Sequence, residues 1–353
     1  MSDQRDVLAE SAARLFEAHA DAAALAQQSG FQHSLWEQVE SLGITALLIA
    51  EDDGGVGADW EDACAVLHRS GYWQIPLPLA ETMLARRLAT AAGLLWPHEP
   101  VSIAILQQTE LSRADGSWRF TGRLTGVPWG RDVNVVFTTA TYTGELHLVA
   151  LNRSDATVRQ AQNLAGEPRD DFRFEGALAQ AAPIESVEAT QLFEYMTLLR
   201  TAQAAGTLES ALHRTLTHAR ERKQFGRPLS QFQVIQHQLA TFGSEVAAVA
   251  CAVSAAARAA CTGDAAFQIA SAKLRANQAI AFATAVAHQV HGAIGFTKEY
   301  PLHHATQRLW SWRSEFGNDR FWSLRLGQLV VARGADAFWP DLTARDDASA
   351  TAT

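Results

Sequence analysis

The C-terminal part of the chain holds the feature that most restricts its fold, a set of long helical stretches that are rich in alanine. Two of them cover residues 193–222 and 231–260. A third is expected from Ala265 to about His291, with Asp264 as its N-cap. Alanine at contact positions lets helices approach closely, as an antiparallel four-helix bundle requires. The sequence therefore predicts such a bundle over residues 188–341, followed by a frayed, flexible tail at 342–353.

Two different patterns precede the bundle. Residues 1–95 place apolar side chains at three- and four-residue spacing, which is typical of helices. Residues 96–187 contain short runs of Val, Thr, Phe and Tyr between Gly, Asp and Asn turns, and they alternate as half-buried antiparallel strands do. The predicted fold class is α+β and multidomain. It comprises an N-terminal helical domain (1–95), a small β-barrel or sandwich (96–187) and the C-terminal four-helix bundle.

Local signals place some of the N-terminal helices. Ser34, with Glu37 three residues later, predicts a capping box for a helix that runs to Leu42. The glycine-rich stretch 51–63 has no preceding strand and no following Lys-Ser/Thr, so an inter-helix loop is favoured over a phosphate cradle. Asp59 is expected to cap the helix after it.

Composition excludes several classes of function. The net charge of −9 and the pI near 5.7 argue against a nucleic-acid partner, which needs a concentrated positive field. No apolar run approaches the ~20 residues that cross a bilayer, and the first residues lack a signal-peptide pattern. The three cysteines are too few and too scattered for a disulfide framework or a zinc site. A reduced, cytoplasmic protein without a membrane partner is predicted.

Two segments in the last third of the chain could carry chemistry. The first, RERKQFGRPLSQFQVIQHQLA (220–240), puts cations and a Gly break at a helix end. Arginine's forked donors there suit a phosphate, although a solvated helix terminus explains the same charges. The second, QVHGAIGFTKEYPLHHATQR (289–308), ends a helix in glycines that could approach a flat ligand. His288 and His291 lack a third ligand at suitable spacing, and the pair His303–His304 is interpreted as a surface pair, so no metal is predicted.

Together these two segments resemble the acyl-CoA dehydrogenase family, whose helical–β–helical order covers nearly the whole chain. The resemblance implies FAD as cofactor, an acyl-CoA thioester as substrate and electron-transfer flavoprotein as electron acceptor. It also implies that this chain reaches across a dimer interface into FAD held mainly by a neighbouring subunit. The implied pyrophosphate and adenine contacts are Arg222, Gln224, Phe225 and Gln233, and those at the adenosine end are Gln289, His291, Gly292 and Ala293.

The resemblance fails at the catalytic base. The family's carboxylate lies directly before a glycine, where this chain has Phe316 before Gly317. Glu315 is one position away. The family's other base position falls on Met196 and Thr197, two residues from Glu194. Glu315 and Glu194 are therefore displaced candidates for the base.

Two further departures lie elsewhere. The β region keeps Thr109–Glu110 but lacks the Gly-Ser-Asp loop that lines the flavin ring in the family. Gln307 stands where the family commonly has arginine followed by aspartate.

These departures share a direction, because the residues lent to a neighbour's FAD are kept and those serving the chain's own site are altered. The sequence favours the smaller, base-poor subunit of a heteromeric (α₂β₂) acyl-CoA dehydrogenase with a longer homologous partner. By resemblance alone, bulky acyl-CoAs such as steroid side chains are the expected substrates. Three alternatives stay open: a self-sufficient homotetrameric dehydrogenase that uses Glu315 or Glu194, a non-enzymatic acyl-CoA-binding scaffold, and a helical interaction module unrelated to flavin.

Overall fold

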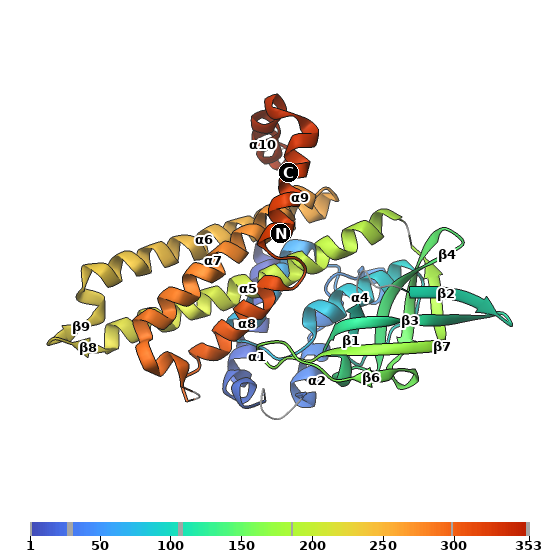
Figure 1. Ribbon diagram of the computed structural model, residues 1–353, viewed down its shortest axis with the longest axis horizontal. Helices are drawn as coiled ribbons and strands as arrows, with labels where there is room; N and C mark the ends of the chain where they lie inside the picture. The colour runs from blue at the N-terminus through green and yellow to red at the C-terminus, as the bar shows by residue number, and fades with distance from the viewer. Residues whose placement is uncertain (1, 27–30, 105–108, 185, 298, 351–353) are drawn as a thin grey trace.

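The computed structural model describes residues 2–26, 31–104, 109–184, 186–297 and 299–350. Its elements follow the predicted helical–β–helical order (Figure 1). The N-terminal helices and the helical bundle share one hydrophobic core, while the strands enclose a second core that includes Phe120, Phe172 and Phe174. The predicted fold class is thereby confirmed.

The N-terminal region consists of helices joined by short turns. They are α1 (Ser2–Ala26), α2 (His33–Ser41), the 3₁₀ turns η1 (Ile44–Ala46) and η2 (Glu51–Asp53), α3 (Trp60–Tyr72) and α4 (Leu79–Ala91). The Asp59 cap is confirmed, because its side chain accepts the Asp62 N–H at 2.9 Å and the Asp62 side chain accepts the Asp59 N–H at 3.2 Å. The predicted inter-helix loop is confirmed but shorter than 51–63: residues 54–59 connect η2 to α3, and residues 60–63 already belong to α3.

The capping box predicted at Ser34 is wrong. Helix α2 begins at His33, and its first hydrogen bond runs from the Trp36 N–H to the Gln32 carbonyl at 3.0 Å. Gln32 is thus the N-cap, without a side-chain cap, and Ser34 lies inside the first turn. The aromatic packing of Phe31 on His33 and Trp36 accompanies this earlier start.

The middle region is one curled sheet with strand order β1-β4-β5-β7-β3-β2, in which β6 also pairs with β7. Side-chain bonds join strands that are not neighbours in this order. Thr109 of β2 donates to the Thr139 carbonyl of β4 at 3.1 Å, and Ser102 of β1 donates to the Pro128 carbonyl of β3 at 2.5 Å. The curled sheet therefore has the form of a small open barrel. Its elements are β1 (Val101–Ala104), β2 (Thr109–Ala114), β3 (Ser117–Pro128), η3 (Gly130–Asp132), β4 (Val135–Tyr142), β5 (Glu145–Asn152), η4 (Arg153–Asp155), β6 (Thr157–Arg159) and β7 (Arg169–Pro183).

The bundle is formed by α5 (Ser186–Glu221), α6 (Gln233–Thr262), α7 (Ala266–His291) and α8 (Leu302–Ser314). Glycine permits its closest contact with the N-terminal helices: a Cβ on Gly206 would stand 1.8 Å from the His68 carbonyl oxygen. The predicted Asp264 cap is wrong. The first bond of α7 runs from the Ile269 N–H to the Ala265 carbonyl, which leaves Asp264 outside the helix.

After the bundle come α9 (Asp319–Arg333) and α10 (Ala335–Ala350), which projects away from the rest of the molecule (Figure 1). The flexible tail predicted at 342–353 is corrected by this helix, which continues through residue 350; residues 351–353 lie outside the described part. Alanines and a Gly334 break just before α10 favour the extra helix.

Two helices of the bundle are unusually apolar. By length and composition, Gln233–Thr262 and Ala266–Phe296 could each cross a membrane. They pack instead against each other and against α5. The absence of a membrane partner stays a prediction.

Candidate functional site

The first motif forms a β-hairpin at one end of the bundle. Strands β8 (Lys223–Gln224) and β9 (Arg227–Pro228) are joined by Phe225 and Gly226, whose φ angles are +50° and +80°. Two successive positive φ values are what a type I′ turn requires. The turn pushes Phe225 outward, so its side chain is 92% exposed. A short 3₁₀ turn, η5 (Leu229–Gln231), then leads to Gln233 at the start of α6.

The second motif forms the turn after α7. Gln289 is exposed on the last turn of the helix, and His291 is buried at its end. Gly292 takes φ +66° and ψ −144°, a conformation that glycine adopts without strain, and opens the 3₁₀ turn η6 (Gly292–Phe296). Gly292 and Ala293 are exposed there, while Lys298 of the motif lies outside the described residues.

The fold brings the two motifs together. His218 lies four residues before Arg222 on α5, and its carbonyl accepts the Arg222 N–H at 2.8 Å. The His218 ring stacks on the ring of His291, with 4.4 Å between centroids and 24° between planes. Hence residues that are far apart in the sequence form one end of the bundle.

The polar side chains at this end are available to a ligand. Four of them are exposed and form no side-chain hydrogen bond or ion pair within the described part of the chain: Arg222, Gln224, Gln233 and Gln289. A guanidinium with several amides and an exposed aromatic ring suits a phosphate-bearing, planar group. These donors fit the dinucleotide portion of FAD.

Glu315, the first candidate base, is held in ion pairs. Its Oε1 accepts from Arg169, with Nη2 at 2.7 Å and Nε at 2.8 Å, and its Oε2 lies 3.4 Å from Arg200 Nε. Asn163 donates a further hydrogen bond to Oε1 at 3.1 Å. This carboxylate therefore links the helical regions to the β region.

The same contacts extend into a larger buried cluster where α4, α5, α8 and the start of β7 meet. This cluster, called the domain joint below, consists of Glu81, Glu167, Arg169, Arg200, Arg308 and Glu315. Burial raises the pKa of Glu167, but Arg169 and Arg308 more than offset this, so its pKa falls to about 2. The indole of Trp312 donates to Glu167 at 2.9 Å and lies between the guanidinium groups of Arg200 and Arg308.

Glu194, the second candidate base, is buried on α5 and forms an ion pair with Arg325 of α9. The family's other base position, at Met196 and Thr197 of this chain, carries no acidic side chain. Met196 is fully buried, and the Thr197 hydroxyl donates to the Phe193 carbonyl at 2.7 Å.

Phe316, which the resemblance puts at the place of the family's usual base, is packed among aromatic rings. Phe316 lies edge-on to Phe193 at 6.1 Å, and Phe193 in turn stacks on Trp322 at 5.8 Å. The indole of Trp322 donates to the Phe316 carbonyl at 2.8 Å. Gly317 has φ +100°, and a Cβ there would stand 2.5 Å from Trp322 Nε1, so this turn is packed tightly around the ring.

The structure says less about the other two departures from the family's pattern, in the stretch around Thr109–Glu110 and at Gln307. The hydroxyl of Thr109 is used within the sheet, Glu110 is exposed, and residues 105–108 of that stretch lie outside the described part. Gln307 is half-buried, and the following Arg308 enters the domain joint.

The histidines do not form a metal site in the structure. Across the described ranges, no group of three or more His, Cys, Asp or Glu side chains is arranged to hold a metal ion. His303 and His304 contact each other with 3.9 Å between ring centroids, and both are half-buried.

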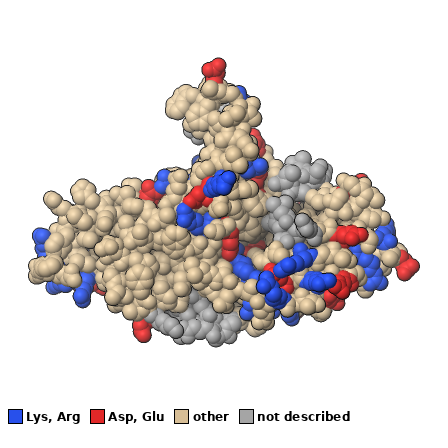
Figure 2. All heavy atoms as spheres, in the orientation of Figure 1, with Lys and Arg blue, Asp and Glu red and all other residues tan. Residues whose placement is uncertain are grey.

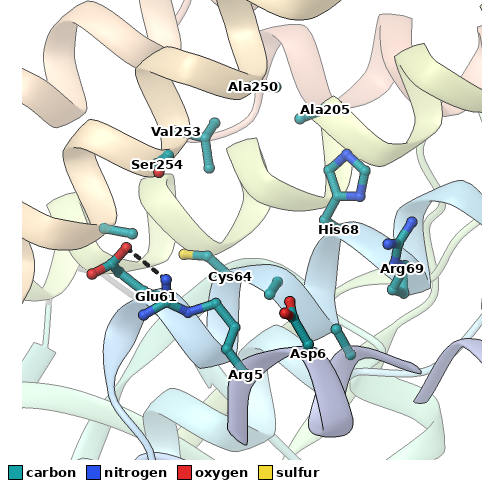
Figure 3. A pocket seen from close by; sticks show the side chains of 13 residues that line it. Arg5, Asp6, Glu61, Cys64, His68, Arg69, Ala205, Ala250, Val253 and Ser254 are labelled. Carbon is teal, nitrogen blue, oxygen red and sulfur yellow. Dashed lines mark ion pairs between the residues drawn. The ribbon is translucent and has the colours of Figure 1, made fainter. Parts of the chain in front are cut away.

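A cavity of about 250 Å³ lies between α1, α3, α5 and α6 (Figure 3). Some of its ionic side chains have partners: Arg5 pairs with Glu61 at 3.1 Å, and His68 pairs with Glu209 at 3.3 Å. None of the predicted site residues lines it. The cavity is therefore separate from the motif-bearing end of the bundle.

Comparison with known proteins gives the class of this fold and site. Residues 2–93 match the N-terminal domain of acyl-CoA dehydrogenases, and residues 188–319 match their C-terminal domain. The chain is similar to the acyl-CoA dehydrogenase IpdE2 of Mycobacterium tuberculosis, with 29% identity over 310 residues, or 85% of this chain and 89% of that protein.

Solved structures share the whole fold. A variant of the Tcur3481–Tcur3483 steroid ACAD has a TM-score of 0.86 at 22% identity, covering 95% of this chain and 99% of that one. The ChsE4–ChsE5 complex from Mycobacterium tuberculosis has a TM-score of 0.81 at 21% identity, with 91% and 96% covered.

The chain belongs to the acyl-CoA dehydrogenase family, since the two matched domains together span more than half of it. The family's members are FAD-dependent flavoproteins, and the chain is accordingly an oxidoreductase that acts on acyl-CoA.

Sequence reasoning missed residues that the structure places in central positions. The domain joint unites side chains from residue 81 to residue 315, and no local pattern links them. His218 lies just before the first motif and Tyr300 lies within the second, and spacing alone gave no sign that both contact His291. Only the assembled bundle reveals these groupings.

Proposed function

We propose that this chain is the base-poor subunit of a heteromeric acyl-CoA dehydrogenase that desaturates the α,β-bond of an acyl-CoA thioester. A longer homologous partner supplies the catalytic carboxylate and most of the flavin pocket. This chain supplies residues that hold the dinucleotide portion of the partner's FAD. The observation that carries the proposal is Phe316, an aromatic ring at the position of the family's base, in a chain whose FAD-side donors are free.

Removal of the α-proton needs a carboxylate that is free to accept it in a dry pocket. Glu315 is bound by two arginines and Asn163, and Glu194 is bound by Arg325. Each of these carboxylates would have to leave its ion pair before it could act as a base. The partner-supplied base needs no such rearrangement.

When bound, FAD would supply the acceptor for the hydride of the β-carbon, the second half of the two-electron oxidation that loss of the α-proton begins. Arg222 and Gln224 of this chain hold the pyrophosphate, with Phe225 and Gln233 toward the adenine. Gln289 and the backbone at Gly292 and Ala293 would hold the adenosine end. His291 is buried, with both ring nitrogens bonded within the chain, so it would position this turn rather than bind the ligand itself. Electron-transfer flavoprotein would serve as the electron acceptor.

The partner has a surface on which to dock. One face of α6 and α7 is exposed but nearly free of charge, as the tan area over these helices in Figure 2 shows. Depletion of charged residues is typical of the core of a protein interface. Its exposed residues are Val234, His237, Thr241, Ser244, Ala247, Ala248 and Cys251 on α6, with Gln278, Phe282 and Ala285 on α7.

The substrate class is proposed from the relatives alone. A steroid ACAD and the ChsE4–ChsE5 complex share the fold over nearly the whole chain. The steroid ACAD favours a bulky acyl-CoA, such as a steroid side chain, and the ChsE4–ChsE5 complex favours an assembly of two different chains. The α₂β₂ stoichiometry and the cytoplasmic location stay predictions from the sequence.

The visible absorbance of the purified protein tests the proposal, first alone and then co-expressed with a longer relative encoded beside it. Flavin absorbance that bleaches with acyl-CoA only in the presence of the partner supports a shared site. A full flavin band in the lone chain would favour the homotetrameric alternative. A protein that is colourless in both cases would favour the acyl-CoA-binding scaffold.

A further inference from the structure

Three aromatic rings from different elements meet where α7 ends. His291 is the last residue of α7, and its ring stacks on His218 of α5. The ring of Tyr300, just before α8, lies 5.0 Å from His291 and 6.2 Å from His218, measured between centroids. The three rings connect the last part of α5, the end of α7 and the segment before α8.

Hydrogen bonds fix the state of the His291 ring. Nδ1 lies 2.8 Å from the Ala287 carbonyl oxygen, which only accepts, so Nδ1 carries the proton. Nε2 lies 3.1 Å from the Tyr300 hydroxyl, which donates to it. Both nitrogens are satisfied in the neutral ring. A second proton, on Nε2, would oppose the hydroxyl hydrogen and break this bond.

The surroundings also disfavour a charged ring. Burial lowers the pKa of His291 to about 4 from an ordinary value of 6.5, and the hydrogen bond to Ala287 offsets only part of this. Burial and then Arg222 lower the pKa of His218. The titratable and charged groups around the rings are Arg214 and Glu221 on α5, Arg222 directly after it, His288 on α7, Tyr300 before α8, and His303, His304 and Arg308 on α8.

The rings are packed against the turn that carries the second motif. The Gly292 N–H donates to the His288 carbonyl, and the His288 ring stacks on Phe296 at 4.1 Å. A Cβ on Gly295 would stand 3.0 Å from the Cβ of His291. Since η6 fits so closely over these side chains, a displaced His291 ring would displace Gly292 and Ala293 as well.

We propose that His218, His291 and Tyr300 form a ring clasp, a set of positioning residues that holds the turn Gly292–Phe296 in register with Arg222. The clasp lets both motifs contact one dinucleotide at the same time. It rests on the proposed function, because the dinucleotide belongs to the shared FAD. The clasp is closed when His291 is neutral and opens when His291 takes a second proton.

The pH dependence follows from the direction of the pKa shift. The folded pKa of His291 lies below its unfolded value, so the stabilisation of the clasp is fully present above about pH 6.5. It is lost progressively as the pH falls toward 4. Flavin release from the complex is therefore expected to accelerate over the same range.

The test measures the rate at which FAD leaves the purified two-subunit complex, between pH 4.5 and 8, for Tyr300→Phe and His291→Phe. Tyr300→Phe removes one buried hydrogen bond, so release at pH 7 is expected to rise about five-fold. In this variant the acid-induced release of FAD is expected at a higher pH than in the wild type, because Nε2 of His291 no longer accepts a hydrogen bond from a hydroxyl. His291→Phe keeps a stacked ring that cannot be protonated, so the acid step should disappear.

Tyr72→Phe is the matched control, since it makes the same change in a half-buried tyrosine on α3 whose ring contacts Trp73 and His213. Release rates and pH profiles of Tyr300→Phe that equal those of Tyr72→Phe would overturn the clasp while leaving the shared site intact. A wild-type complex without flavin would overturn the proposed function and the clasp together. If Tyr300→Phe does not fold, imidazole NMR of the wild-type chain decides: a His291 proton on Nδ1 with titration below pH 5 supports the clasp, and another tautomer or titration near pH 6.5 contradicts it.

Discussion

The motif-bearing end of the bundle and the domain joint use their polar side chains in opposite ways. At the bundle end, Arg222, Gln224 and Gln289 are exposed and have free donors within the described structure. At the domain joint, Arg169 and Arg200 are buried and pair with carboxylates. Free donors on a surface are available to a ligand from outside, whereas buried paired charges hold a fold together.

The comparison explains why Glu315 is a poor candidate for the base although it lies next to the family's catalytic position. A change of one residue along a tight turn points the side chain in another direction. Here Phe316 faces Phe193, while Glu315 faces Arg169 and Arg200. Lying one residue away from the family's base position therefore does not give Glu315 the role of the base.

The largest loss of stability is expected from a substitution that breaks the ion pairs of the domain joint. Arg200→Met leaves Glu81 buried without its cation and removes one partner of Glu315. Loss of one member of a buried ion pair costs about 3–5 kcal/mol, so the free energy of unfolding should fall by about that amount. Urea-induced unfolding of the lone chain, followed by circular dichroism, measures it.

Arg173→Met is the control, because its pair with Glu175 is about 70% exposed at both side chains. Exposed pairs contribute about 0–1 kcal/mol, so little change is expected. Equal losses in both variants would mean that the joint is not the structural element described above.

A smaller change in stability is expected from a substitution at the motif-bearing end of the bundle. Arg222→Met removes a free guanidinium but no internal contact of its side chain, so the stability of the lone chain should change by less than about 0.5 kcal/mol. FAD binding by the complex should nevertheless weaken about ten-fold or more, since a charge-assisted hydrogen bond contributes about 1.5–3 kcal/mol. Equilibrium dialysis of the complex measures the affinity. An unchanged affinity would remove Arg222 from the site.

The sequence predicts the fold well where its signals are local and repeated. Alanine-rich helices, alternating strands and the Asp59 cap are confirmed by the structure. Ser34 and Asp264 are not N-caps, because the first hydrogen bond of each helix is accepted by the carbonyl of a neighbouring residue. A cap motif competes with packing that acts over longer distances, and packing prevails here.

The sequence predicts the two motifs of the candidate site but not the residues that the fold brings together around them. The two motifs can be found because their residues are contiguous, and the fold places them at one end of the bundle. The domain joint draws Glu81, Glu167 and Glu315 from three separate regions, so it exists only after the regions have assembled. The ring clasp likewise depends on contacts between three elements.

The roles of Glu315 and Glu194 distinguish the shared site from a self-sufficient enzyme most directly. The measurement is the rate of acyl-CoA-dependent flavin bleaching by the two-subunit complex, with Glu315→Gln and Glu194→Gln each introduced into this chain. Both rates are expected to stay within about two-fold of the wild type at a temperature where the variants remain folded, because the partner provides the base. A loss of about 100-fold or more in either variant, the size expected for a missing general base, would contradict the shared-site proposal.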